Sequence, residues 1–461
     1  MRLMRSINPA TEELIAEYEE NSAAEVGQIL ASSSTAFRDW SRRSFEDRAA
    51  PLASAARIML ERRHQLARRI SQEMGKPIDQ SVAEIEKCAS VCNFYAENAE
   101  RLLADVPGIG MSDLALTTSR PLGPVLAIMP WNFPYWQVFR FLAPTLMAGN
   151  VGILKHANTV QGCASDLIEL IREAGFPTGT FQNLRLSDQA TEALIADPTI
   201  RAVSLTGSTR AGRAVAAAAG RSLKKCVLEL GGSDPYLILE DADLKLAVKC
   251  CVTSRLINTG QSCIAAKRFV VVKEIAAEFT ELCLEEVSKK TQGDPLEDPS
   301  PDLGPLARKD LRDQLHRQVE QSVSQGARLL CGGEIPGGRG FFYPPTLLTE
   351  VSQDSPAACE ELFGPVAAIM VVSDCDEAIA VANRTPYGLG GAVFTRDLAR
   401  GERIAREEIH AGCCYVNDFV RSDPRLPFGG IGDSGYGREL AALGIHEFVN
   451  EKTISVSPGA E

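Results

Sequence analysis

The chain has 461 residues, 45% hydrophobic and 23% charged, a length that predicts more than one domain around a substantial core. Its formal net charge of -12 argues against a nucleic-acid partner and against an anionic membrane surface, because both bind basic proteins. No apolar run reaches the roughly 18 residues of a membrane span, and residues 1–13 lack a signal core, so we expect a cytoplasmic protein.

The N-terminal hundred residues have the apolar periodicity of helices. Residues 48–74 predict one helix with Leu60 and His64 near its apolar face, and a second helix is expected over about residues 79–103. The polar, alternating stretch 111–120 predicts a strand.

From residue 124 onward, short apolar runs alternate with helical patterns. One series of runs spans residues 125–129, 151–155, 202–206 and 225–230, and a second spans 267–272, 367–372, 391–395 and 413–417. This rhythm is typical of parallel strands covered by helices on both faces. We therefore predict two α/β lobes with the break near residues 231–232.

The cysteines and histidines do not indicate a metal site. The chain has 13 cysteines and five histidines, and no cysteine pair has the spacing of zinc or redox sites. Most of these thiols fit small buried hydrophobes in a reducing compartment.

Three residues, far apart in the chain, have the placement of a catalytic set. Cys263 lies in the loop 258–263, where glycine and small polar neighbours leave the sulfur accessible. Glu229 ends a strand directly before two glycines, and Asn132 follows a strand between two prolines, where its amide can donate to an oxyanion. Each also has a plainer interpretation: a turn thiol, an ion-paired glutamate and a turn-forming asparagine.

Six motifs occur in an order that resembles the aldehyde dehydrogenase superfamily over nearly the full length, most similar to bacterial succinate-semialdehyde dehydrogenases. They are PWNFP (130–134), SLTGSTRAG (204–212), LELGG (228–232), GQSC (260–263), EELFGP (360–365) and PFGGIGDSGYGRE (427–439). The resemblance implies a Rossmann-like cofactor domain, an α/β catalytic domain and a small β oligomerisation element.

The resemblance also assigns catalytic roles. Cys263 attacks the aldehyde, while the amide of Asn132 and the backbone N–H of Cys263 hold the oxyanion. Glu229 then activates the water that hydrolyses the thioester. Because relatives that transfer the acyl group to coenzyme A lack this base, its presence favours release of the free acid.

The cofactor implied by the resemblance is NADP or NAD. The fingerprint GxGxxG is absent, but a strand runs into Gly207 and Ser208 at the start of an alanine-rich helix, where N–H groups can face a pyrophosphate. Leu230 would border the nicotinamide, and Trp131 belongs to the same cofactor set. Without the family match, the turn at 207–212 would be an ordinary helix start.

The ribose contacts follow from the same resemblance. Lys155 matches a lysine that bonds the adenosine ribose, and Asn158 stands where many NAD-dependent members have a glutamate that repels a 2′-phosphate. We therefore expect NADP to be accepted. Glu361 and Phe363 match residues at the nicotinamide ribose and ring, although Glu360 is adjacent and a shift of one position stays open.

A semialdehyde substrate carries a second carboxylate, which needs a cation. Arg140 matches an arginine with this role in relatives, and an ion pair with a core carboxylate is an equal alternative. A second arginine found in many relatives is replaced by Ile257, and Arg421 or Arg425 is a candidate substitute.

The resemblance divides the chain as follows: residues 1–103 and 122–231 form the NAD(P)-binding domain, 232–444 the catalytic domain, and 104–121 with 445–461 an element that assembles a homodimer or homotetramer. Three hypotheses remain: an NAD(P)-dependent semialdehyde or general aldehyde dehydrogenase, a thiol esterase, and a non-catalytic scaffold protein. The combination of Cys263, Glu229 and Asn132 favours the first.

Overall fold

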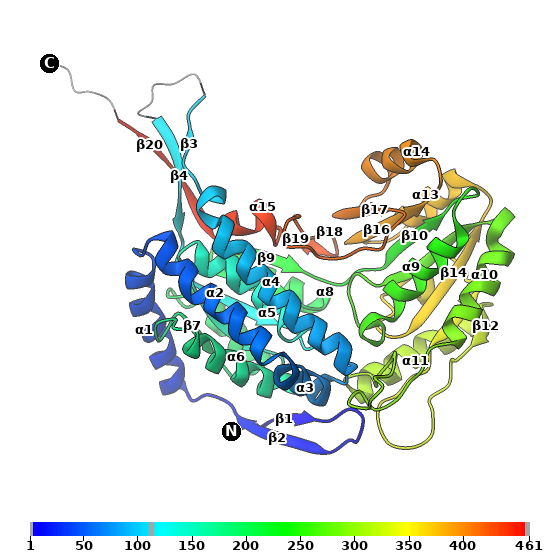
Figure 1. Ribbon diagram of the computed structural model, residues 1–461, viewed down its shortest axis with the longest axis horizontal. Helices are drawn as coiled ribbons and strands as arrows, with labels where there is room; N and C mark the ends of the chain where they lie inside the picture. The colour runs from blue at the N-terminus through cyan, green and yellow to red at the C-terminus, as the bar shows by residue number, and fades with distance from the viewer. Residues whose placement is uncertain (1–2, 110–114, 457–461) are drawn as a thin grey trace.

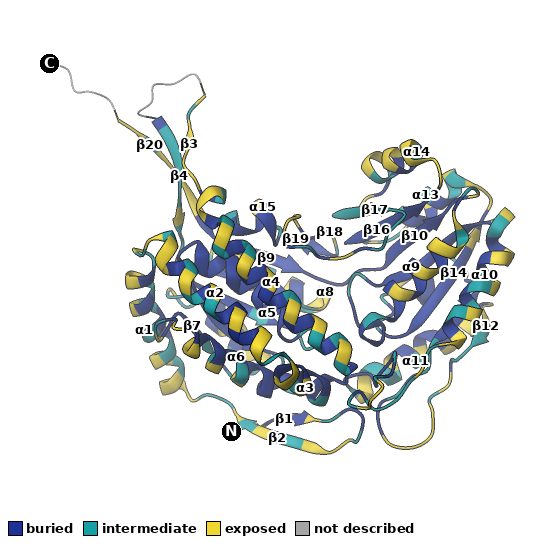
Figure 2. Ribbon diagram, viewed as in Figure 1, coloured by how far each residue is buried: buried dark blue, intermediate teal, exposed yellow. Residues whose placement is uncertain are grey.

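The computed structural model describes residues 3–109 and 115–456. Two lobes, each built on its own mostly parallel sheet, lie side by side, and a narrow β arm projects from the first lobe (Figure 1). Helices cover the sheets, so the strands are buried while the outer helix faces are exposed (Figure 2). The predicted α/β fold class is confirmed.

The first sheet has the strand order β19-β9-β8-β5-β6-β7, with only β19 antiparallel. Its strands are β5 (Pro124–Met129), β6 (Val151–His156), β7 (Phe181–Asn183), β8 (Ala202–Thr206), β9 (Lys225–Glu229) and β19 (Gly435–Tyr436). The helices of this lobe are α1 (Ala23–Trp40), α2 (Phe45–Glu61), α3 (Arg63–Met74), α4 (Ile78–Leu102), α5 (Trp136–Met147), α6 (Gln161–Glu173), α7 (Asp188–Ile195), α8 (Thr209–Arg221) and α15 (Ala441–His446), with the short η1 (Asn158–Val160).

The second sheet has the order β12-β13-β14-β11-β10-β16-β17 and is parallel except for the edge strand β12. Its strands are β10 (Asp234–Ile238), β11 (Ala266–Val272), β12 (Arg328–Cys331), β13 (Thr346–Thr349), β14 (Val366–Val372), β16 (Gly390–Phe394) and β17 (Cys413–Val416). Its helices are α9 (Leu244–Leu256), α10 (Lys273–Ser288), α11 (Lys309–Ser324), α12 (Pro356–Cys359), α13 (Cys375–Asn383) and α14 (Leu398–Arg403), with η2 (Ile257–Gly260) and η3 (Ile404–Glu408). All eight predicted apolar runs form strands, because buried strands are apolar on both faces.

The arm is a three-stranded antiparallel sheet in the order β20-β4-β3. It joins β3 (Val106–Pro107) and β4 (Ala115–Pro121) to β20 (Val449–Ser455) near the C-terminus (Figure 1). The predicted strand 111–120 thus corresponds to β4, and its first part, residues 111–114, lies outside the described residues. Two short strands, β15 (Tyr387–Gly388) and β18 (Ile431–Gly432), form a separate ladder.

The prediction of one helix over residues 48–74 is wrong. α2 ends at Glu61, Arg62 leaves the helical conformation (φ -105°, ψ 14°), and α3 starts a new register. Two residues expected on the buried face of one continuous helix are instead on the surface. Leu60, at the end of α2, is 40% exposed, and His64, at the start of α3, is exposed. The helix expected over 79–103 is confirmed as α4.

The first 19 residues were expected to be helical, and this is also wrong. β1 (Leu3–Ile7) and β2 (Leu14–Glu19) form an antiparallel hairpin. Ser6 Oγ donates to Glu73 Oε1 at 2.7 Å and contacts the carbonyl of Thr159 at 3.0 Å, so the strand is held by residues distant in the chain. Such tertiary contacts override a weak local preference.

The domain bounds stay a prediction, and one detail of the sheet crosses them. β19 lies within the predicted catalytic range 232–444 but pairs with β9 of the first sheet, where Gly435 lies opposite Glu229. None of the helices in the described ranges is both long and apolar enough to cross a bilayer.

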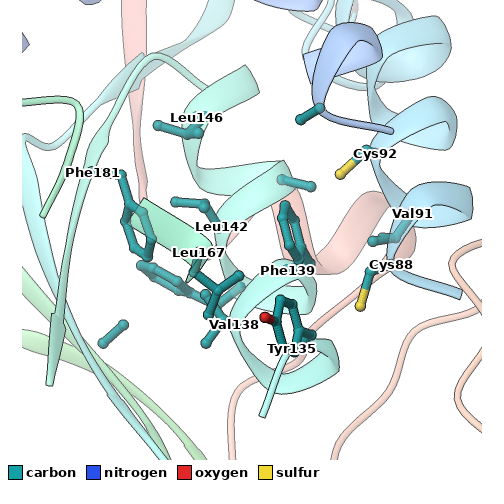
Figure 3. Packing of buried hydrophobic residues seen from close by; sticks show 14 of the residues in the cluster. Cys88, Val91, Cys92, Tyr135, Val138, Phe139, Leu142, Leu146, Leu167 and Phe181 are labelled. Atoms are coloured by element: carbon teal, nitrogen blue, oxygen red, sulfur yellow. The ribbon is translucent and has the colours of Figure 1, made fainter. Parts of the chain in front are cut away.

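The core of the first lobe lies where α4 packs against α5. Cys88, Val91 and Cys92 of α4 are fully buried near Tyr135 and Phe139 (Figure 3). The apolar positions of α4 recur every three to four residues, as a helix with one buried face requires. This packing fixes the two helices that form one wall of the site below.

Candidate active site

Cys263 lies on the wall of a cavity of about 280 Å³ to which both lobes contribute. Side chains from α4, α5, the segment before β11 and the loop after β17 line it, among them Lys87, Trp136, Arg140, Ile264, Phe419 and Phe428. The wall is mostly apolar or aromatic, and the volume is near the lower limit of ligand sites, about 300 Å³. The cavity therefore suits a small substrate.

The loop that carries Cys263 has an unusual backbone. It begins within η2, where Asn258, Thr259 and Gly260 have φ values of 55°, 54° and 73°. A left-handed conformation is strained for a β-branched threonine. At Gly260 any Cβ would lie 2.3 Å from the carbonyl oxygen of Gly364, so glycine is required. The surrounding structure must hold this loop in place.

Two buried cations hold the loop from behind. Lys267 Nζ donates to the carbonyls of Ser262 at 3.0 Å and Cys263 at 2.7 Å. Arg255 Nη2 donates to the carbonyl of Gly260 at 2.5 Å. Because charged donors make the stronger hydrogen bonds, these contacts fix the backbone on both sides of the nucleophile.

Burial raises the pKa of the Cys263 thiol to about 12, while the charges of Arg140 and Lys267 oppose this shift. The side chain is nevertheless half-buried, so a substrate can reach the sulfur. At neutral pH the resting residue is therefore a thiol, and its proton must leave as the sulfur attacks a carbonyl.

Glu229 ends β9, 2% exposed, and neither carboxylate oxygen has a hydrogen-bond partner among the described residues. Burial raises its pKa well above the ordinary 4.5, Glu439 adds to the shift, and the charges of Arg140 and Arg438 oppose it. Burial and the charge of Glu439 therefore raise the affinity of this carboxylate for a proton.

The end of β9 contacts the nucleophile loop directly. A Cβ on Gly232 would lie 2.8 Å from the carbonyl oxygen of Cys263, so the two backbones meet only because residue 232 is glycine. Gly232 is three residues after Glu229, and the charge of Glu229 adds to the raised pKa of the Cys263 thiol, so the two side chains lie in the same region.

Asn132 reaches the same loop from the first lobe. It is 5% exposed, its Nδ2 donates to the carbonyl of Gln261 at 3.1 Å, and its own carbonyl accepts from Asn258 Nδ2 at 2.8 Å. A side-chain amide has two N–H donors, so one remains beyond the bond to Gln261. The loop that carries Cys263 thus contacts the Asn132 side chain and the glycine three residues after Glu229.

The turn that carries Asn132 is supported by two buried groups. Both ring nitrogens of His156 lie at hydrogen-bond distance from backbone carbonyls, Nδ1 3.2 Å from that of Met129 and Nε2 2.9 Å from that of Pro134. Burial lowers the pKa of His156 to about 4 and keeps it neutral. Glu84 Oε1 accepts from the N–H groups of Tyr135 and Trp136 at the start of α5.

Glu361 faces the site and Glu360 does not. Glu361 Oε1 accepts from the N–H of Gly232 at 3.0 Å and lies 3.8 Å from Lys267 Nζ. Glu360 is exposed and accepts from Gln318 instead. Of the two adjacent glutamates, only Glu361 therefore points toward Gly232 and Lys267. Two half-buried aromatics lie nearby, since the rings of Trp131 and Phe363 meet edge to face at 5.8 Å.

The turn between β8 and α8 has the geometry of an anion site. Ser208 caps α8 by accepting from the N–H of Ala211 at 3.3 Å. A Cβ on Gly207 would meet only a leucine side chain at 3.7 Å, so the approach is open. Leu230 packs against the same helix at Gly212, where a Cβ would lie 2.4 Å from Leu230 Cδ1.

Lys155 and Asn158 lie at the end of β6 and in η1. Lys155 Nζ contacts the exposed carboxylate of Asp188 at 3.2 Å. Asn158 Oδ1 is buried and has no hydrogen-bond partner among the described residues. An orphaned buried oxygen of this kind is completed by a ligand hydroxyl, so this region fits the ribose of a dinucleotide.

Arg140 has the ion pair that was one of its two alternatives. It is 2% exposed, its guanidinium pairs with Glu439 and contacts Thr206 Oγ1 at 3.3 Å, and it lies over the ring of Phe428 at 4.9 Å. The same side chain lines the cavity. Arg140 is therefore ion-paired, and it also contributes a cation to the wall.

Sequence reasoning missed Lys267, Arg255 and His156. A Lys–Arg pair at the start of an otherwise apolar strand is the one signal in the sequence, since a charge at such a position needs a buried partner. Within residues 3–109 and 115–456 no group of three His, Cys, Asp or Glu side chains could hold a metal ion.

A half-buried thiol, a buried carboxyl with a raised pKa and a side-chain amide beside a dinucleotide-type sheet are the features of a thiol-dependent α/β oxidoreductase. Residues 1–454 match the aldehyde dehydrogenase family. The chain belongs to this family.

Similar proteins agree with this assignment. The chain is 44% identical over 449 residues to the succinate semialdehyde dehydrogenase [NAD(P)+] Sad of Escherichia coli (strain K12), covering 97% of each chain. It is 46% identical over 455 residues to a probable succinate-semialdehyde dehydrogenase [NADP(+)] of Synechocystis, covering 98% of this chain and 99% of that one. The solved succinic semialdehyde dehydrogenase of Streptococcus pyogenes in complex with NADP+ has a TM-score of 0.95 and 36% identity, covering 99% of this chain and 100% of that one.

Proposed function

We propose that the chain oxidises an aldehyde carrying a distal carboxylate, succinic semialdehyde, to the dicarboxylic acid with NADP or NAD. One observation carries the proposal: Cys263 lies on the wall of a small cavity, and its loop contacts both the Asn132 amide and Gly232, three residues after Glu229. The names of similar bacterial proteins support the same substrate and cofactors.

In the first step, the thiol proton of Cys263 passes to water and Sγ forms a bond to the aldehyde carbon. The carbonyl oxygen gains the negative charge, and the free N–H of the Asn132 amide with the backbone N–H of Cys263 stabilises it. When bound, the dinucleotide supplies the electron acceptor that takes hydride from the substrate carbon. The substrate is then a thioester on Cys263.

In the second step, the ionised form of Glu229 accepts a proton from water, and the water oxygen attacks the thioester carbon. The carbon–sulfur bond breaks, the acid leaves and Cys263 takes up a proton again. The raised pKa of Glu229 supports this role, because it brings the proton affinity of the carboxylate closer to neutral pH.

The cofactor residues are proposed from the same geometry. Gly207 and Ser208 would face the pyrophosphate at the start of α8, and Lys155 with Asn158 would hold the adenosine ribose. Asn158 is neutral, so a 2′-phosphate meets no like charge at this position, and NADP is accepted.

The nicotinamide end would lie where the two lobes meet. Leu230, Trp131 and Phe363 would provide its apolar surroundings, and Glu361, held by the N–H of Gly232, would bind its ribose. Arg140 would contribute a positive charge toward the substrate, although its pair with Glu439 weakens that charge.

The assay is absorbance at 340 nm with succinic semialdehyde and NADP. We expect the absorbance to rise with the wild-type chain. Cys263→Ala should abolish this rise and leave the circular dichroism spectrum unchanged. A thiol esterase would hydrolyse esters without producing this absorbance, and a scaffold protein would show neither activity. A preference for small aldehydes without a carboxylate would favour a general aldehyde dehydrogenase.

We also propose that the arm assembles a homodimer or homotetramer. β20 is exposed along most of its length and is an edge strand of the three-stranded sheet. Open edges of this kind pair across subunits. A monomeric mass in light scattering would contradict the proposal.

A further inference from the structure

Lys87 on α4 is a cation in the cavity that has no acidic partner. Its Nζ donates to Ser422 Oγ at 2.8 Å and lies 4.1 Å from the ring centre of Trp136. Among the described residues, no carboxylate oxygen lies within 4 Å of this ammonium group, although the side chain is largely enclosed.

The other cations of the wall are all paired. Lys76 pairs with the buried Glu84, Arg140 with Glu439, and Arg421 with Asp418. Each of these charges is compensated within the protein, so none needs an external anion. Of the four cations that the described residues bring to the wall, Lys87 is the one whose contacts are all neutral.

An enclosed ammonium without a counter-ion is costly, because it has lost water and gained no opposite charge. Burial and, to a smaller extent, the positive charge of Arg140 lower the pKa of Lys87 to about 8, while Cys88, Glu84 and Asp423 oppose the shift. An anion bound beside Lys87 would remove this penalty, so the cavity favours a negatively charged ligand.

The rest of the wall limits what that ligand can be. Phe133, Trp136, Phe419 and Phe428 provide apolar surfaces for methylene groups, while Cys263 provides the reactive end. A ligand that satisfies all of these contacts has an aldehyde, a short apolar chain and a terminal carboxylate.

We propose that Lys87, held by Ser422 and Trp136, binds the terminal carboxylate of the substrate and selects short semialdehyde anions over uncharged aldehydes. This inference rests on the proposed function. It adds a specificity residue on α4, an element that carries none of the catalytic groups.

The test compares succinic semialdehyde with butanal, which has the same four-carbon chain without the carboxylate. Loss of one hydrogen bond to a charged group predicts that Lys87→Met lowers kcat/KM for succinic semialdehyde about 10- to 100-fold. The value for butanal should stay within about twofold, since no charged contact is lost. Lys245→Met on the exposed face of α9 removes the same charge far from the cavity and should change neither value.

Two results would overturn the role of Lys87: kcat/KM values that stay within about twofold of wild type for both aldehydes, or an equal fall for both, which would show that Lys87 only shapes the cavity. Failure of the proposed function is seen separately, because the wild-type chain itself would then show no preference for succinic semialdehyde. Should Lys87→Met not fold, Lys87→Gln keeps a polar contact to Ser422, removes the charge and gives the same two outcomes.

Discussion

Replacing Lys267 with methionine tests whether the nucleophile loop is held by a buried charge. Lys267 is fully buried, and its Nζ donates to the carbonyls of Ser262 at 3.0 Å, Cys263 at 2.7 Å and Ala265 at 3.4 Å. Methionine has a similar length but no donor, so these carbonyls would lose their partner without a large change in volume.

The expected cost follows from two opposing effects. Each hydrogen bond from a charged donor contributes about 1.5–3 kcal/mol, so the two shorter bonds contribute about 3–6 kcal/mol. Removing the ammonium also relieves its own burial, which lowers the pKa of Lys267 in the folded protein. Because unpaired buried groups dominate when one partner is removed, we expect a net loss of about 3 kcal/mol.

Hydrogen exchange of the amides in residues 256–266 measures this loss locally. A cost of about 3 kcal/mol corresponds to roughly a hundredfold faster exchange, since 1.4 kcal/mol is tenfold. Lys245→Met, which removes an exposed lysine from α9, is the matched control and should leave the exchange unchanged. Exchange within about twofold of wild type in Lys267→Met would refute the argument.

Three further predictions concern the site. Glu229→Gln should slow thioester hydrolysis about 10²- to 10⁴-fold, so that a burst of reduced cofactor precedes slow turnover. The raised pKa of Glu229 favours its neutral form, so the folded wild type loses stability as pH rises above the unfolded pKa, near 4.5. Urea unfolding should therefore show the variant to be more stable than wild type at pH 7 and equally stable at pH 4. Asn158→Glu should weaken NADP binding at least tenfold in a fluorescence titration, whereas Asn158→Gln should not, and equal NADP binding by both would contradict the proposed ribose contact. Gly260→Ala should lower the free energy of unfolding by about 3 kcal/mol or more, because its Cβ would lie 2.3 Å from the carbonyl oxygen of Gly364. Gly175→Ala, at φ +97° with free space around it, should lower it by only about 1–2 kcal/mol. Equal losses for the two variants in urea unfolding would refute the clash.

The fold could be predicted from the sequence where the burial of a segment requires it to be made of apolar residues. Every strand of the two sheets that the apolar runs predicted is present, because strands buried on both faces must be apolar throughout. Residues 3–19 and the break at Arg62 were not predictable, since the hairpin depends on contacts such as Ser6 with Glu73, and the break changes the register of α3. Local periodicity carries no information on either.

The candidate site was predictable only in part. Cys263, Glu229 and Asn132 stand next to turns with glycine or proline, a signal that the sequence displays. Lys267 and Lys87 give almost no such signal, because their importance lies in which groups surround the ammonium: backbone carbonyls for one, and a hydroxyl and an aromatic ring for the other.

The sequence alone determined the fold class, the superfamily resemblance and the residue types available for chemistry, because these follow from composition, periodicity and motif order. Only the tertiary structure decided which of two adjacent glutamates faces the site, that Arg140 is already paired with Glu439, and that Lys87 has no acidic partner. The reason is physical: the charge state and the available partners of a buried group depend on atoms that are distant in the chain and close only after folding.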